Sequence, residues 1–532
     1  MLDKVLEGGL IFDGSGKAPF EADVGISGDR IAEIGDLSAA DAEERISVAG
    51  LAVSPGFIDL HTHSDFTLAA NGRAESQVHQ GVTTEVVGQC GVSCAPARSR
   101  EDIALMAPGY LPGEVETDWL SFGEYLDHLA RKPLGVNVAA FVGHGTIHRA
   151  VLGDALRPAR DEEVEDMAGL LERSLDEGAY GFSTGLEYWP GSLATPDQLA
   201  RLCAVAAAKE LLYATHVRNR DLFYDLGFGE AIATARVAGA RLQISHIQPK
   251  YGAPAQAMAH SLEMIAQARR QGVDVACDVI PHDWSHTRVL AILPQWAQEG
   301  GLDAVRARLK DRETRAKIKR NPRPMWRLVS DGRWEEIRLL QSLANPDLVG
   351  LDFAEIGSKR RCDPYDAALD LLLEEEGEAM NHLMWTSHSF SDDDIKLALS
   401  DGGCAVISDT LALAPYGCLK HSIGSLSGYG WAARFLQHYV RDQKVMTLEE
   451  GLRRLTSLPA DRLGLKDRGR LAKGCFADIT VFDARAIASH FELREPRRYA
   501  SGIAYVLVNG AFAMRDGTRS ETDNGQVLRS GA

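Results

Sequence analysis

The fold of this chain is decided by residues 54–94, which read SPGFIDLHTHSDFTLAANGRAESQVHQGVTTEVVGQCGVSC. A short apolar run after SPG is followed by His61 and His63 in alternation. Because alternate residues of a strand point to one face, both imidazoles are expected on the same side. A second apolar run, residues 83–87, leads into GQCG and places Cys90 at a glycine-flanked strand end. The stretch therefore predicts half of a metal site.

The composition is that of a globular enzyme. The chain has 532 residues, of which 45% are hydrophobic and 25% charged, so it can form one large domain and a smaller companion. With 57 Lys and Arg against 75 Asp and Glu, its net charge is -18. An acidic surface repels phosphate backbones, so we expect no nucleic-acid partner.

The sequence also predicts the cellular location of the protein and the redox state of its cysteines. Its start lacks the pattern of a signal peptide, and no run approaches the roughly 20 apolar residues that span a bilayer. We therefore expect a cytoplasmic protein without a membrane partner, and leave a homo-oligomer open. The eight cysteines are scattered along the chain, which favours reduced thiols over a disulfide framework.

Short strands separated by turns are expected at both ends of the chain. They are residues 4–12, 22–27, 30–34 and 46–53 near the start, and 478–482, 502–508 and 511–515 near the end. Since the two ends share this character and the middle differs, we expect one small β-sandwich built from both termini. The expected boundaries are 1–54 and 472–532 for the sandwich, and 55–471 for the inserted catalytic domain.

Apolar runs alternate with helical stretches through the middle of the chain. The runs are residues 56–60, 83–87, 136–142, 180–183, 211–215, 241–245, 274–279, 383–386 and 404–407. Helices are expected at 161–177, 196–209, 229–238 and 255–271. Repeated βα units of this number favour an α/β fold of the TIM-like (β/α)8 barrel type over an open sheet. The charged stretch 301–359 is expected to be an insertion before the last strands.

In such a barrel, the C-terminal ends of the strands face one site. Those ends carry His61, His63, Cys90, His144, Glu187, His216, His246, His282 and Asp409. Imidazole, thiolate and carboxylate are the ligands that zinc prefers, and a catalytic zinc keeps a position open for water. Of these residues, Glu187 is either part of the site or a surface-loop acid. His144, His282 and His286 are expected to support the ligands.

These motifs resemble those of the amidohydrolase superfamily and, within it, the D-aminoacylase (N-acyl-D-amino-acid deacylase) group. The similarity extends over essentially the whole chain. It is carried by PGFIDLHTHSD, QGVTTEVVGQCGVSCAP, GAYGFSTGLEYWPG, ATHVRNR, LQISHIQ, ISDT, MTLEEGLRRLTSLPADRLGLKDRGRLAKGCFADITVFD and GIAYVLVNG. The resemblance implies a TIM-like barrel with a small β-sandwich, and zinc-dependent hydrolysis of the amide bond of N-acyl amino acids of D configuration.

The resemblance also implies roles for individual residues. Cys90, His216 and His246 match the ligands of a tightly bound zinc. His61 and His63, with Cys90 and Asp409, match a second and weaker metal position. Asp409 also corresponds to the general base that takes a proton from the attacking water, and Tyr188 and Ser285 correspond to positions that contact the substrate.

The sequence departs from this group at two cations that bind the substrate carboxylate. Relatives usually carry SHHK and HPR, where this chain has SHIQ at 245–248 and HSI at 421–423. The candidate replacements are Lys250, Arg218, Arg220, Arg288 and Lys420. Glu187 stands where many relatives have an apolar residue, and a carboxylate there could bridge two metals.

Two other functions stay open at this point. The missing cations also fit a hydrolase of another small-molecule amide, a cyclic imide or a carbamate. A third hypothesis is that the chain is a non-catalytic binding protein related to these enzymes. The complete set of candidate metal ligands argues against this hypothesis. Fold resemblance alone does not choose a substrate.

Overall fold

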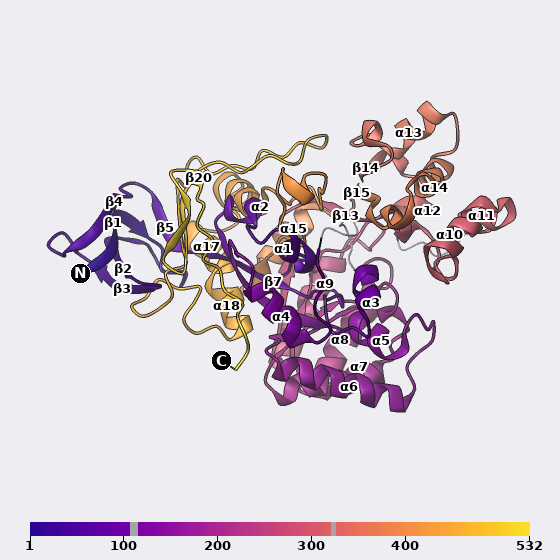
Figure 1. The fold of residues 1–532 in the computed structure, drawn as a ribbon, viewed down its shortest axis with the longest axis horizontal. Helices are drawn as coiled ribbons and strands as arrows, with labels where there is room; N and C mark the ends of the chain where they lie inside the picture. The colour runs from indigo at the N-terminus through magenta and orange to yellow at the C-terminus, as the bar shows by residue number, and fades with distance from the viewer. Residues whose placement is uncertain (107–114, 321–325, 532) are drawn as a thin grey trace.

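The computed structural model describes residues 1–106, 115–320 and 326–531. Strands from both termini form one nine-stranded sheet in the order β20-β19-β18-β17-β5-β1-β2-β3, with β4 paired to β1. They are β1 (Leu2–Ile11), β2 (Phe20–Ser27), β3 (Arg30–Gly35), β4 (Ala42–Ser47), β5 (Ala52–Pro55), β17 (Ile479–Phe482), β18 (Ile503–Val508), β19 (Ala511–Arg515) and β20 (Thr518–Arg519). Since β5 pairs antiparallel with β17, the N-terminal and C-terminal strands join in one sheet, toward the left of Figure 1.

One expected terminal strand is divided in two. The run 46–53 is broken after β4 by a turn in which Gly50 has a φ of +79°, and the chain resumes as β5. Both halves pair in parallel with β1. Glycine permits the left-handed turn that a continuous strand would not contain. The three-part division at residues 54 and 471 stays a prediction.

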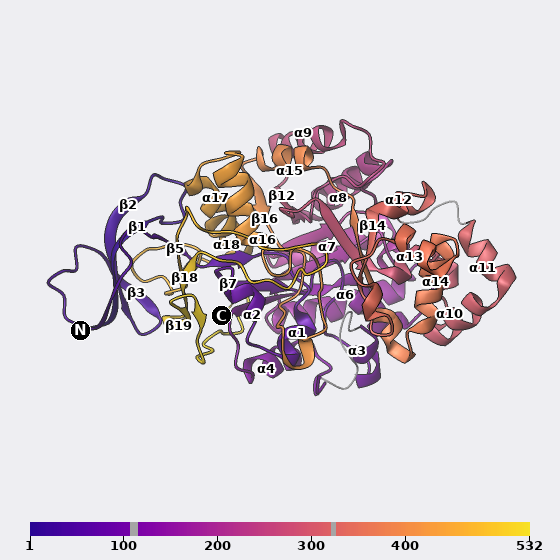
Figure 2. The ribbon, with the colours of Figure 1, turned by 90° about the horizontal axis from the view of Figure 1, so that it is seen from above.

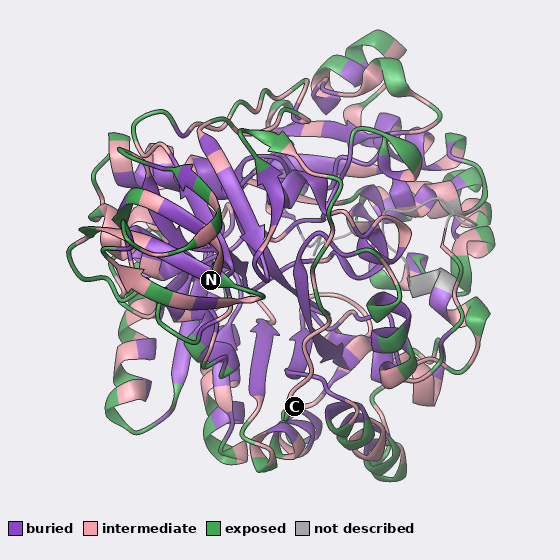
Figure 3. Cartoon of the chain, turned by 60° about the vertical axis from the view of Figure 1, so that its left-hand side comes forward, coloured by how far each residue is buried: buried purple, intermediate pink, exposed green. Residues whose placement is uncertain are grey.

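Eight parallel strands form the barrel, in the order β16-β12-β11-β10-β9-β8-β7-β6. They are β6 (Phe57–Asp59), β7 (Val82–Val87), β8 (Asn137–Gly143), β9 (Gly181–Gly185), β10 (Leu212–His216), β11 (Arg241–Ile244), β12 (Val275–Val279) and β16 (Cys404–Val406). In Figure 3 these strands are buried at the centre, while the helices expose their outer faces. The predicted TIM-like barrel is confirmed.

The barrel closes just beyond the ends of its first and last strands. Thr62 and Thr410 form a parallel bridge, the His63 amide donates to the Thr410 carbonyl at 2.8 Å, and the Asp409 amide donates to the His61 carbonyl at 3.1 Å. Closure therefore brings two candidate ligands from the start of the barrel against the aspartate from its end.

Helices surround the barrel. They are α1 (Asp65–Ala70), α2 (Glu75–Val78), α3 (Arg100–Met106), α4 (Phe122–Ala130), α5 (His144–Leu152), α6 (Asp161–Asp176), α7 (Pro196–Ala208), α8 (Tyr224–Ala238), α9 (Ala257–Arg270), α15 (Asp392–Leu399), α16 (Trp431–Arg434), α17 (Leu448–Leu455) and α18 (Ser457–Leu463). The four predicted helices correspond to α6–α9. Thr195 and Gln198 form a capping box with Pro196 at the first turn, which explains why α7 begins there. None of the described helices is both long and apolar enough to cross a membrane.

An insertion separates β12 from β16. It contains a three-stranded antiparallel sheet of β13 (Trp284–Arg288), β15 (Met384–His388) and β14 (Ile337–Gln341), in that order. Its helices are α10 (Gly301–Lys310), α11 (Arg312–Lys319), α12 (Arg327–Ser330), α13 (Phe353–Arg360) and α14 (Pro364–Glu374). They lie at the far right of Figures 1 and 2 and pack around a core of their own.

Two expectations about this region are corrected. The run 383–386 is not a barrel strand, because it lies in β15 and pairs antiparallel with both neighbours. Its Trp385 packs against Phe353 within the insertion, and an apolar run does not reveal which sheet it joins. The insertion also extends beyond the expected 301–359, because its described elements run from β13 to β15; residues 321–325 lie outside the described part.

Candidate metal centre

Three buried side chains at the C-terminal ends of barrel strands form the first group of candidate ligands. Cys90 lies just after β7, His216 ends β10 and His246 lies just after β11. Cys90 Sγ is 3.8 Å from His216 Nδ1 and 3.3 Å from His246 Nε2. All three residues are buried, and their donor atoms lie within 4.8 Å of one another. We call them the inner ligand group.

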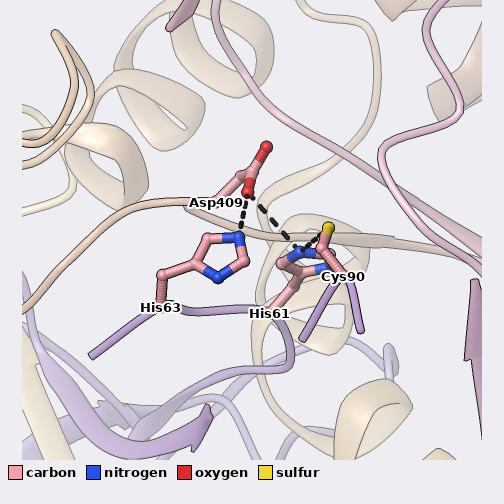
Figure 4. A group of neighbouring side chains, drawn as sticks. All are labelled: His61, His63, Cys90 and Asp409. Atoms are coloured by element: carbon pink, nitrogen blue, oxygen red, sulfur yellow. Dashed lines mark hydrogen bonds and ion pairs between the residues drawn. The ribbon is translucent and has the colours of Figure 1, made fainter. Parts of the chain in front are cut away.

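The second group shares the thiol and is more open. It consists of His61, His63, Cys90 and Asp409, whose donor atoms also lie within 4.8 Å of one another. Figure 4 shows Asp409 between the two imidazoles, with Oδ1 at 3.2 Å from His63 Nε2 and 3.5 Å from His61 Nε2. Cys90 Sγ is 3.3 Å from His61 Nε2. We call these residues the outer ligand group, and Cys90 joins the two groups.

The backbone is strained where it presents these side chains. The angle φ is +53° at Cys90, +33° at His246 and +49° at Asp409. Such conformations cost about 1–3 kcal/mol each in residues other than glycine, and they gather at functional sites. Next to Cys90, a Cβ added to Gly88 would lie 2.0 Å from the carbonyl oxygen of Phe141. Gly88 is therefore needed for the close approach of β7 to β8.

Asp278 fixes the loop that carries His246. Its carboxylate accepts hydrogen bonds from the His246 amide at 2.5 Å and from Gln243 Nε2 at 2.8 Å. Arg220 donates to the His246 carbonyl at 2.7 Å. Burial raises the pKa of Asp278 to about 6. Sequence reasoning missed this residue, although a charged side chain in an apolar strand was a signal.

Asp59 ties the two ends of the barrel together. It accepts hydrogen bonds from the amides of His61 at 3.3 Å and Ser408 at 3.1 Å. Burial raises the pKa of Asp59 to about 7, against the lowering effect of these hydrogen bonds. Asp59 therefore holds the two segments that supply His61 and Asp409. Its role also escaped the sequence analysis, because it depends on barrel closure.

Glu187 lies beside the inner ligand group. Its Oε2 is 2.9 Å from His216 Nε2, the ring nitrogen that faces away from Cys90. Its Oε1 forms a buried ion pair with Lys250. In the described part of the chain, Glu187 belongs to neither set of candidate ligands. A carboxylate in this position orients a ligating imidazole and raises its basicity.

The other predicted histidines lie around the centre rather than in it. Buried His144 begins α5, and burial lowers its pKa to about 3. His282 contacts Asp283 at 3.3 Å. His286 lines the cavity described below, and its pKa is lowered by burial against the charge of Asp409.

The two predicted substrate contacts both line that cavity. Tyr188 donates a hydrogen bond to the Cys90 carbonyl at 3.2 Å and packs edge-on against His216. Ser285 forms hydrogen bonds with the hydroxyls of Ser387 at 2.9 Å and Ser389 at 3.0 Å. Tyr188 therefore connects the cavity wall to the ligand loop, and Ser285 belongs to a hydroxyl network.

Opposite charges accumulate at the centre. Burial alone would raise the pKa of Cys90, but the charge of His61 and the hydrogen bonds from His216 and His246 hold it well below its usual range. The pKa of Asp409 is likewise lowered despite burial, by the hydrogen bond from His63 and the charge of His61. In return, the charges of Cys90 and Asp409 raise the pKa of His61 to about 9 although burial opposes the shift.

This donor set fits a divalent zinc ion. Zinc prefers thiolate, imidazole and carboxylate ligands, and the two groups supply all three types. A centre whose thiolate and carboxylate attract protons onto adjacent imidazoles will also attract a cation in their place. The inner group offers three buried donors, and the outer group adds donors next to open space.

A cavity of about 1290 Å³ opens over the ligands. Its walls include His63, Cys90, His216, His246 and Asp409, together with residues of β13 and of α10 in the insertion. The insertion therefore completes the wall of a chamber whose floor is the metal centre, as expected at the C-terminal face of a barrel.

The sequence model of the amidohydrolase family matches residues 44–320 and 374–514, which is most of the chain. The chain belongs to the amidohydrolase family. This amidohydrolase is 33% identical over 531 residues to N-acyl-D-glutamate deacylase of Alcaligenes xylosoxydans xylosoxydans, with 100% of this chain and 97% of the relative covered.

Two solved structures are similar over the whole amidohydrolase chain. One is N-acyl-D-glutamate deacylase from Bordetella bronchiseptica, complexed with zinc and a phosphonate inhibitor that mimics the tetrahedral intermediate. The other is a D-aminoacylase described by its binuclear metal centre, with one-metal activation and second-metal attenuation. Each is 30% identical, gives a TM-score of 0.81, and is matched over 99% of this chain and 100% of its own.

Proposed function

We propose that this amidohydrolase removes the acyl group from N-acyl amino acids of D configuration, with a water molecule activated at the metal centre. The position of Asp409 carries the proposal. It belongs to the outer ligand group, lines the cavity and exposes 15% of its side chain. A base is therefore available where a substrate can reach it. The activities named for the relatives support the substrate class.

The residues divide the work as follows. Cys90, His216 and His246 would hold a tightly bound zinc, and His61 and His63 would bind a second, weaker metal together with Cys90 and Asp409. When bound, zinc polarises a substrate carbonyl and allows water to ionise near neutral pH. Glu187 orients His216 by its contact with Nε2 of the ring, and Asp278 fixes the His246 loop by accepting a hydrogen bond from the His246 amide.

Asp409 transfers the proton. Its lowered pKa keeps the carboxylate ionised at neutral pH, so it begins the reaction as a base. It takes a proton from the attacking water and gives it to the leaving nitrogen as the C–N bond breaks. The products are a carboxylic acid and a free amino acid. His63 Nε2, at 3.2 Å, fixes the carboxylate during both transfers.

A substrate panel tests the proposal. Zinc-loaded protein is incubated with N-acetyl-D-amino acids, N-acetyl-L-amino acids, hydantoins and carbamates, and the released amine is measured. Hydrolysis of the D series with little activity on the others is expected. Activity confined to hydantoins or carbamates would contradict the proposal. The cytoplasmic location and a homo-oligomeric state stay predictions.

A further inference from the structure

Among the described residues, five arginines line the cavity above the metal centre: Arg149, Arg218, Arg220, Arg288 and Arg327. A substrate that carries a carboxylate needs a cation that is free to receive it, because a cation already paired within the protein offers fewer donors. The partners of these arginines therefore show which one is free for a ligand.

Two of the arginines are committed to the protein near the ligands. Arg218 binds Glu230 through Nε at 2.8 Å and Nη2 at 2.9 Å, and it also donates to the carbonyls of Ser192 and Ala194, each at 2.8 Å. Arg220 is buried and donates to the carbonyl of His246. Both guanidinium groups stabilise the walls of the site.

Two more form ion pairs with aspartates of the protein. Arg149 contacts Asp154 at 3.0 Å, and Arg327 contacts Asp331 at 3.8 Å. The lysines suggested by the sequence are not available either. Lys250 is buried against Glu187, and exposed Lys420 is not among the residues that line the cavity.

Arg288 differs from all of these. Within residues 1–106, 115–320 and 326–531, its guanidinium has no ion pair or hydrogen bond to another side chain or carbonyl. Arg288 is exposed and lines the cavity, where desolvation by the cavity walls and the nearby charge of Arg149 lower its pKa. Its guanidinium donors are therefore open to an anion that enters the cavity.

The position of Arg288 on its strand sets how far it lies from the metal centre. Arg288 ends β13, two residues after His286, so both side chains leave the strand on the same side. His286 is close enough to the centre to feel the charges of Asp409, His63 and Cys90. Two residues of a strand span about 7 Å, about twice the roughly 3.5 Å length of one amino-acid unit, and the long Arg288 side chain covers the difference.

We infer that Arg288 is the anion-binding residue of this cavity and receives the carboxylate of the N-acyl amino acid while the acyl carbonyl lies at the metal centre. The inference rests on the proposed function. A planar guanidinium binds a carboxylate through two parallel hydrogen bonds. This contact selects substrates that carry an anion about one residue from the scissile bond, and it discriminates against neutral amides.

The experiment compares N-acetyl-D-leucine with N-acetyl-D-leucinamide, which has the same shape without the charge. Arg288→Gln is expected to raise KM for the acid by about tenfold to a hundredfold, with kcat and zinc content close to wild type. KM for the amide should stay unchanged. Arg288→Lys should recover part of the affinity for the acid. Arg327→Gln removes a paired arginine of the same cavity and serves as the matched control.

Binding is measured separately by calorimetry in the Asp409→Asn background, where turnover does not interfere. Arg288→Gln should weaken binding of the acid by a similar factor and leave binding of the amide unaltered. Equal effects on acid and amide, or no effect on either, would overturn the role of Arg288. Failure of the wild type to hydrolyse any N-acyl amino acid would overturn the proposed function, while the calorimetry would still decide whether Arg288 binds the carboxylate.

Discussion

The two ligand groups share one sulfur atom but differ in their surroundings. In the inner group, His216 and His246 are buried and held from outside by Glu187 and the backbone contact of Asp278. In the outer group, the side chains of His63 and Asp409 are 23% and 15% exposed and face the cavity. The inner group is therefore built to hold an ion, and the outer group is built to meet a substrate.

The difference also appears in the charges of the ligands. Burial and the charge of Arg220 lower the pKa of His246 to about 3, so this imidazole is neutral and ready to ligate at pH 7. The pKa of His61 is instead raised to about 9. A cation at the inner group finds His246 deprotonated, whereas a cation at the outer group must displace protons.

The largest effect is expected from removing the atom that the two groups share. Cys90→Ala should leave the protein without bound zinc and lower activity by more than about 10⁴-fold, since both binding and chemistry are lost. Zinc is measured by atomic absorption after dialysis. Cys362→Ala makes the same chemical change in the insertion and should leave zinc and activity intact. Retention of zinc by Cys90→Ala would remove Cys90 from the ligand set.

Asp409→Asn should separate binding from chemistry. The amide cannot accept the proton from water, so kcat should fall by about 10²- to 10⁴-fold, while the inner group keeps its zinc. Steady-state kinetics and metal analysis are carried out on the same preparation. A wild-type kcat in this variant would show that another residue is the base.

Glu187→Gln should act on the inner group alone. It removes the carboxylate that orients His216 and breaks the ion pair with Lys250, so zinc affinity should weaken by about 10- to 100-fold. Competition with a chelator measures this change. Glu162→Gln, on the exposed face of α6, is the control. An unchanged affinity would mean that His216 is oriented by other contacts.

The smallest expected effect is a change in the number of protons released when metal binds. His61 has a raised pKa of about 9, so it is protonated at pH 7 and its proton must leave when metal binds. Metal uptake should therefore release protons, and apparent affinity should increase as pH rises toward 9. Calorimetry in buffers of different ionisation enthalpy counts the protons. His61→Ala should release fewer protons than the wild type, and an equal count in both proteins would be evidence against the contrast between the groups.

Much of this centre was readable from the sequence, because each ligand follows an apolar run and barrel strands end at one face. His61, His63, Cys90, His216, His246 and Asp409 come together as that rule predicts. The barrel itself was predictable for the same reason. The local sequence pattern was therefore enough to predict a side chain's place in the site wherever that place depended only on the end of its own strand.

The remaining features depend on contacts between distant segments. Asp59 acts only because closure brings Ser408 to it, and the partner of Glu187 is a lysine 63 residues later. The strand at 384–388 has an apolar pattern that fits either sheet, and its packing in the insertion decides which one it joins. The choice of Arg288 among five candidate cations likewise required the partners of the others.

In the proposed division, Cys90 joins a tight inner site to a weaker outer one. Zinc per chain, measured after exhaustive dialysis of His246→Ala and His63→Ala, distinguishes the two sites. We predict no zinc in His246→Ala and one equivalent in His63→Ala. Retention of one equivalent by His246→Ala, together with its loss from His63→Ala, would contradict the account.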